Sequence, residues 1–225
     1  MPSGDRDPTA HPSPGEPLPH DAATDVAPGR PDLDLRLVAA LERTGHALRV
    51  LLWQQARRHG LSPIQVQLLE LLASGPPVRR RVGVLAADLD VRSPTVSDAV
   101  AALKRKGLVE DVPVLGDGRM RQLDLTADGD RVVAELADWH GAVAGRLEAA
   151  GAARKADTLE LLLDLVASLQ RDGVITVART CPGCRYFVRD AAPGADRPHR
   201  CGLLDAPLGR ADLRVDCDEH EPVVA

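Results

Sequence analysis

Apolar residues recur every three or four positions through most of residues 34–171, which is the spacing of amphipathic helices. Polar caps, prolines and glycines divide this region. Ser62-Pro63 and Ser93-Pro94 can each begin a helix, and Gly75 and Gly107 can each end one. The pattern predicts helices over residues 34–58, 63–74, 85–89, 94–106, 126–149 and 154–171. The long apolar stripes of the last two fit an interface between protein surfaces better than a pocket.

Residues 84–126 combine a short helix, a tight turn at residues 90–93, a longer helix and a hairpin. In the longer helix, Val96, Val100 and Leu103 share one face, so the opposite face must lie outward. Hydroxyl groups at the start of such a helix suit the major groove of DNA, where base edges and phosphates are within hydrogen-bonding range, although the same residues can be plain helix caps. The candidate DNA contacts of this helix are Arg92, Ser93, Thr95, Ser97, Asp98 and Arg105.

The hairpin after this helix is predicted from a strand ending near residue 114, a turn over residues 115–118 and a returning strand from residue 119. Arg119 and Arg121 lie near its tip, from which they can reach phosphates or a minor groove. Ahead of the short helix, the run of arginines at residues 79–81 can contact phosphates or form a solvated basic loop.

Charge is distributed unevenly along the chain. The formal net charge is −5, whereas residues 78–121 hold nine Lys or Arg against six acids. The acidic total argues against a protein that coats nucleic acid indiscriminately. A locally basic segment inside an acidic protein is nevertheless compatible with a sequence-specific DNA contact surface.

The segment LAADLDVRSPTVSDAVAALKRKGLV, followed by GDGRMRQLDLTADG, resembles the winged helix-turn-helix of the MarR family of bacterial transcription regulators. The resemblance covers residues 34–172 and is most specific at Thr95-Val96-Ser97, Lys106-Gly107-Leu108-Val109 and Leu125-Thr126-x-x-Gly129. It implies a homodimer, with its first helix shared across the dimer, that places two such elements on double-stranded DNA at a pseudo-palindromic operator. It also allows a small-molecule effector. Gly118 departs from the family, because many members carry Arg there in an Asp-x-Arg-Arg run.

The ends and the overall composition limit the other classes of protein. Residues 1–31 hold eight of the 18 prolines and hardly any large apolar residue, so we expect this tail to be disordered. No run of about 18 apolar residues and no signal-peptide core occurs, so we expect a cytoplasmic protein with no membrane partner. No Ser-His-Asp set, phosphate-binding glycine loop or recognisable carboxylate pair occurs, so we do not expect an enzyme.

All four cysteines lie in residues 173–225, whose composition differs from the rest. Cys181-Pro-Gly-Cys184 is a knuckle that can point two thiolates at one ion, and Cys201 and Cys217 can complete the site from later loops. His199 and His220 lie close enough in sequence to replace a ligand or to support one. Four thiolates suit zinc, iron or an iron–sulfur cluster. Zinc is the more common staple of small loop-rich modules, whereas a cluster would explain why a regulator carries the module.

These features predict a mainly α fold with a small β-wing, a winged helix-turn-helix of the α+β class, and a small loop-rich metal-binding module at the C-terminus. The expected divisions are residues 1–31, 32–172 and 173–225. The leading hypothesis is a dimeric, sequence-specific DNA-binding regulator that responds to redox state, metal or a small ligand through the four-cysteine site. One alternative is a thiol redox protein using Cys181-Pro-Gly-Cys184, although this pair does not open a helix after a strand as such pairs usually do. Another is a metal-stapled interaction module without DNA binding.

Overall fold

The computed structural model describes residues 32–114, 117–136 and 140–223, and residues 117–120 by their backbone only. The chain divides into two compact units, residues 1–45 and 46–225. The disorder predicted for residues 1–31 concerns residues outside the described part. Among the described helices, none combines the length and the apolar character needed to span a membrane.

Most helices lie where the apolar spacing predicts them. They are α1 (Leu33–Arg58), α2 (Pro63–Ser74), α3 (Val82–Asp88), α4 (Ser93–Arg105) and α7 (Ala152–Arg171). At the start of α2 the N-cap is Ser62, and its amide donates a hydrogen bond of 3.1 Å to Gln65 Oε1. At the start of α4 the N-cap is Arg92 and not Ser93, so the predicted Ser93 cap is wrong by one residue.

The single helix predicted over residues 126–149 is described as two elements, and residues 137–139 between them lie outside the described residues. The described chain has α5 (Ala127–Leu136) and a separate α6 (Gly141–Leu147), whose N-cap is His140. Gly141 and Gly145 weaken a helix, and no residue of α6 is buried. Because packing supplies most of the stability of helices in proteins, nothing in this part of the sequence enforces one continuous helix.

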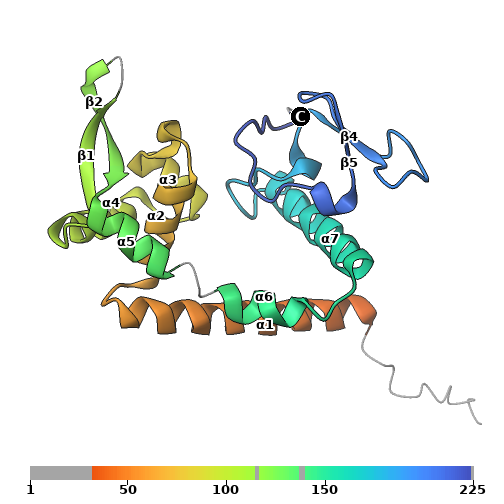
Figure 1. Ribbon diagram of the computed structural model, residues 1–225, viewed down its shortest axis with the longest axis horizontal. Coiled ribbons are helices and arrows are strands. Elements are labelled where there is room, and N and C mark those ends of the chain that lie inside the picture. The colour runs from red at the N-terminus through yellow and green to blue at the C-terminus, as the bar shows by residue number, and fades with distance from the viewer. Residues whose placement is uncertain (1–31, 115–116, 137–139, 224–225) are drawn as a thin grey trace, which may run out of the picture. The chain divides into compact units, whose positions relative to one another are not determined.

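The hairpin consists of β1 (Val109–Val114) and β2 (Asp117–Leu125), which pair antiparallel from Val109 opposite Leu125 to Pro113 opposite Arg121. It projects from the base formed by α4 and α5 (Figure 1). The second strand begins at Asp117, two residues earlier than the predicted turn allows. The register shifts between Pro113 and Val114.

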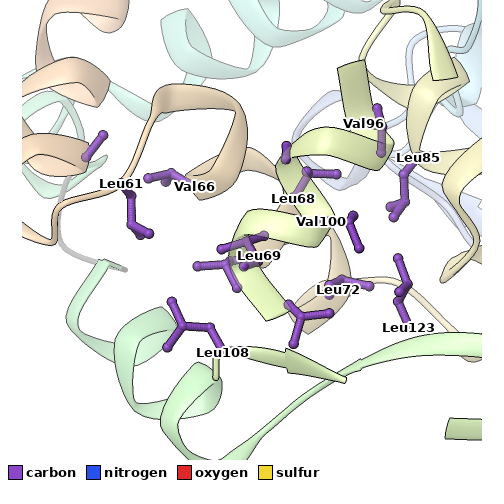
Figure 2. Close-up of a cluster of buried hydrophobic side chains, with 14 of the residues drawn as sticks. Leu61, Val66, Leu68, Leu69, Leu72, Leu85, Val96, Val100, Leu108 and Leu123 are labelled. Carbon is purple, nitrogen blue, oxygen red and sulfur yellow. The ribbon is translucent and has the colours of Figure 1, made fainter. Parts of the chain in front are cut away.

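The core of this region lies between α2, α3, α4 and the base of the hairpin (Figure 2). Leu68, Leu69 and Leu72 of α2 are fully buried, and Leu85 of α3 and Val96 of α4 point into the same cluster. Leu123 adds a side chain from β2. The inward face of α4 is therefore fixed by packing on three elements, which leaves its opposite face free to serve another purpose.

The base of the hairpin is closed by Thr126. Its hydroxyl donates to Gly107 O (2.6 Å) and accepts the amide of Gly129 (3.1 Å), which caps α5 as the sequence predicts. The amide of Thr126 also donates to Leu108 O (3.2 Å). One residue thus joins the end of α4, the start of β1 and the first turn of α5.

Thr126→Ala removes this cap and is expected to lower the free energy of unfolding by about 0.5–2 kcal/mol. Chemical denaturation of the full chain measures the change. Thr158→Ala on α7 is the matched control, because the Thr158 hydroxyl only bonds back to Arg154 O within its own helix. Removal of that bond is expected to be neutral or slightly stabilising. Equal losses for the two variants would contradict the role given to Thr126.

The C-terminal residues form a small module on α7. It contains the turn η3 (Cys181–Gly183), an antiparallel sheet in the order β3 (Phe187–Val188), β4 (His199–Cys201) and β5 (Ala206–Leu208), and the turn η4 (Arg210–Asp212). The turns η3 and η4 contact α7, whose Leu163 and Ala167 are buried. One face of the apolar stripe on α7 therefore packs on this module, whereas Leu161, Leu162 and Leu165 remain exposed.

Candidate nucleic-acid interface and cysteine pocket

The outward face of α4 presents a row of polar side chains. Val96, Val100 and Leu103 are buried on one side of this helix, as the sequence predicts. All six candidate DNA contacts of this helix are exposed, and within the described part of the chain their side chains have no hydrogen-bond or ion-pair partner. These residues are Arg92, Ser93, Thr95, Ser97, Asp98 and Arg105. Their polar groups are therefore available to a ligand outside the chain.

Much of the positive charge near α4 is used inside the protein. The ammonium of Lys104 lies 2.6 Å from Asp111 Oδ2, and that of Lys106 donates to Gly60 O (2.6 Å) and Gln65 Oε1 (3.0 Å). Arg80 pairs with Asp124 of β2. The basic excess counted along the sequence thus overstates the charge available to DNA. Among the described residues, the free cations at α4 are Arg105 and the N-cap residue Arg92.

The structure describes the side chain of only one of the two candidate arginines of the hairpin. Arg121 is exposed, and its guanidinium donates to Asp111 O across the hairpin (2.9 Å). Arg119 lies on β2 closer to the tip, and its side chain is outside the described part of the structure.

The four cysteines line one pocket of about 460 Å³, including the part open to solvent. Cys181 opens η3, Cys184 follows it directly, Cys201 ends β4, and Cys217 comes from the last loop. None of the four forms a disulfide. The other lining residues are mainly apolar or aromatic and are Tyr186, Phe187, Leu203, Leu204, Leu208, Arg214 and Glu219. Residues separated by 36 positions in the sequence thus converge on one space.

Hydrogen bonds reach two of the sulfurs. The amide of Arg214 donates to Cys181 Sγ (3.2 Å), and its guanidinium donates to Cys217 Sγ (3.4 Å). Burial raises the pKa of the Cys181 thiol, the Arg214 amide opposes this, and the three other cysteines raise the pKa further. A reactive thiol of a redox enzyme needs the opposite shift. In the described part of the chain, no three His, Cys, Asp or Glu side chains lie close enough together to hold a single metal ion.

The two histidines expected near the site lie outside the pocket lining. His199 is 1% exposed, accepts the amide of Asp190 at Nδ1 (3.3 Å) and has Nε2 3.2 Å from Glu160 Oε1 of α7. His199 therefore lies against α7 and not in the pocket. The Nε2 atom of His220 lies close to Gly183, between the two cysteines of the Cys181–Cys184 knuckle in the sequence. Burial lowers the pKa of His220.

The module is bonded directly to the helix-turn-helix. Arg79 is buried, and its guanidinium lies 2.9 Å from Asp216 Oδ2 and 2.6 Å from Asp218 Oδ1. Arg179 pairs with Asp88 at the end of α3 (2.6 Å), where the carboxylate is 4% exposed. Arg79 is thus neither a phosphate contact nor part of a solvated loop, contrary to both sequence interpretations of residues 79–81.

The turn between α3 and α4 is held by the same module. Asp90 has a φ of +51°, a left-handed conformation that Asp tolerates better than most residues. Its carboxylate accepts the amide of Thr176 (2.7 Å). These contacts join residues about 90 to 140 positions apart. The only hint of these contacts in the sequence is the pair of aspartates, Asp216 and Asp218, on either side of Cys217.

The order α2, α3, α4, β1, β2 and the packing described above define a winged helix-turn-helix protein. Residues 59–120 match the family model described as MarR family. The same fold occurs in the MarR family transcription regulator SP03579 (21% identity, 63% of this chain and 95% of the other, TM-score 0.53). It also occurs in the transcriptional regulator PA3341 (25% identity, 60% and 98%, TM-score 0.53). The helix-turn-helix of this chain is therefore similar to that of the MarR family, and the fold is that of these two regulators.

A third solved structure is CouR from Rhodococcus jostii RHA1 bound to p-coumaroyl-CoA, with 18% identity, 60% of this chain and 95% of the other covered, and a TM-score of 0.52. A comparison with curated proteins finds no match. These three structures cover 60–63% of this chain, and the family model ends before the cysteine-rich module.

Proposed function

We propose that this chain is a dimeric, sequence-specific DNA-binding transcription regulator whose C-terminal module adjusts DNA binding. The observation that carries the proposal is the exposed, unpartnered polar row on the outward face of α4. Polar groups that no other part of the described chain satisfies are suited to base edges and phosphates in a major groove. The arginines of the hairpin, Arg119 and Arg121, are proposed to add contacts to the DNA backbone.

Exposed apolar side chains support the dimer. Leu35, Val38 and Leu41 of α1 are 65%, 51% and 41% exposed. Leu161 and Leu165 of α7 are 58% and 41% exposed. Contiguous apolar residues on helix faces commonly mark a contact with another protein surface. A second copy of this chain is the partner we propose, because the MarR resemblance implies it and a two-fold dimer would present two copies of α4 to a palindromic site.

Two kinds of signal are compatible with the module and the fold. The four-cysteine pocket supports a response to metal or redox state. The binding of p-coumaroyl-CoA to CouR supports a small ligand as the alternative effector. Either signal must act by changing the relative stability of states that differ in their affinity for DNA. The proposed role is regulation without catalysis.

The wing contacts are tested by Arg119→Ala and Arg121→Ala. Each is expected to weaken binding to specific and random duplexes by a similar factor and to reduce the slope of log affinity against log salt by about 1. Fluorescence anisotropy at several salt concentrations measures these values. Arg154→Ala is the matched control, since it removes the same charge from an exposed position on α7.

An unchanged salt slope in both hairpin variants would contradict the wing contacts. A wild-type protein that binds the specific and the random duplex equally would contradict the proposal as a whole. Arg154→Ala should leave unchanged both the affinity for DNA and the slope of log affinity against log salt.

A further inference from the structure

The sulfurs of the cysteine pocket are arranged around a space. Zinc holds thiolates at about 2.3 Å, which places neighbouring sulfurs of a tetrahedral site about 3.8 Å apart. All four cysteines line one pocket, yet among the described residues no three of the usual ligands approach closely enough for a single ion. A polynuclear centre fits this arrangement better, because each of its irons can take one thiolate from a different side.

The walls of the pocket suit such a centre. Phe187, Leu204 and Leu208 are among its apolar lining residues and limit access of water. The amide of Arg214 donates to Cys181 Sγ, and hydrogen bonds to ligand sulfurs are one means by which proteins tune iron–sulfur clusters. The guanidinium of Arg214 beside Cys217 Sγ places a positive charge next to a centre that four thiolates would make negative.

The loop that carries the fourth cysteine also contacts the helix-turn-helix. Asp216 and Asp218, on either side of Cys217, both bind the buried guanidinium of Arg79. The amide of Cys217 donates to Arg179 O (3.0 Å), and the side chain of Arg179 pairs with Asp88 at the end of α3. The position of Cys217 is therefore linked through two arginines to the connector before α3 and to the end of α3.

We propose that the four cysteines hold an iron–sulfur cluster and that the Cys217 loop couples its presence to the stability of the helix-turn-helix. The regulatory half of this proposal rests on the proposed DNA-binding function, whereas the binding of the cluster does not. Cluster assembly takes one proton from each of the four thiols and fixes Cys217 in the pocket. With Cys217 fixed, Asp216 and Asp218 are held against Arg79. Without the cluster, the loop is held only by its own hydrogen bonds and ion pairs.

The first experiment measures iron, acid-labile sulfide and zinc per chain in the full-length protein, purified without oxygen and then incubated with ferric iron, sulfide and thiol, in which the thiol reduces part of the iron. The expected result is iron and sulfide in equal amounts, with broad visible absorption. Cys201→Ser should lose most of the iron and the colour, because it removes one of the four thiolates. Cys201 ends β4 and does not belong to the Cys217 loop that contacts the helix-turn-helix. Wild-type protein that takes up one zinc per chain and no iron would overturn the proposal, even if the variant failed to fold.

The second experiment measures hydrogen exchange of residues 82–93 with and without the cluster. We expect protection about 5- to 150-fold greater with the cluster, which is the range of ordinary allosteric couplings. Arg79→Ala should keep its iron but reduce this difference, because only the link through Arg179 then remains, whereas Arg154→Ala should keep both the iron and the full difference. Equal exchange in cluster-loaded and cluster-free wild-type protein would overturn the coupling. Because neither measurement uses DNA, this failure is separate from a failure of DNA binding.

Discussion

Replacing Thr95 and Ser97 together by alanine is expected to remove most of the preference of this protein for its operator. Both hydroxyls lie exposed on the outward face of α4, near its N-terminal end. Each lost contact to a base costs about 1–3 kcal/mol, so the double variant should lose about 2–6 kcal/mol of specific affinity if both hydroxyls contact bases. Binding to random duplexes depends on phosphate contacts and should change little. Anisotropy titrations with an operator duplex and a scrambled duplex measure the two affinities.

The control for this pair is Ser74→Ala. Ser74 is an exposed hydroxyl of the same region, and it bonds only to Glu70 O at the end of α2. Its loss should leave both affinities unchanged. If the double variant weakens operator and scrambled duplexes by the same factor, Thr95 and Ser97 do not read sequence, and the assignment of α4 as the recognition helix is wrong.

Gly129→Ala is expected to be the most destabilising of the single substitutions considered. A Cβ at this position would lie 2.1 Å from Leu108 O and 3.3 Å from a methyl carbon of Leu125. The clash is with backbone, so neither rotamer change nor local repacking can relieve it. The expected loss of unfolding free energy exceeds about 4 kcal/mol, which is beyond the usual range of single substitutions. Thermal or chemical denaturation measures it.

Gly83→Ala is a matched glycine control. Gly83 lies in α3 with a helical backbone, and no atom lies within 4 Å of an added Cβ. Alanine there should stabilise the helix by about 0.5–1 kcal/mol. If Gly129→Ala were as well tolerated as Gly83→Ala, the close approach of α5 to the start of β1 would be incorrect.

The helices and the hairpin were largely predictable because their signals are local. The spacing of Val96, Val100 and Leu103 fixes the buried face of α4, and the opposite face follows from it. Ser62-Pro63 marks the start of α2 because its cap depends only on neighbouring residues. The pattern around Gly129 is recognisable in the sequence, but the reason why glycine is needed there is not. The carbonyl that excludes a side chain at this position belongs to Leu108, 21 positions earlier.

The remaining features depend on packing between distant parts of the chain. The apolar residues of α5 and α6 follow one helical period, so their spacing alone predicts a single helix over both. His199 was expected to support a metal, yet it pairs with Glu160 of α7, which spacing alone cannot indicate. The bonds from Arg79 to the Cys217 loop span more than 130 positions. No local pattern predicts such partners, although they decide how the module meets the helix-turn-helix.

Two copies of α4 are proposed to read a specific DNA sequence, and selection of bound duplexes from a random pool tests this most directly. Wild-type full-length protein should enrich one inverted repeat, with half-sites about 10 base pairs apart or a multiple of this distance. The Thr95 and Ser97 double variant should fail to enrich it. Enrichment of no motif by wild-type protein that is folded and stable under the same conditions would contradict the claim.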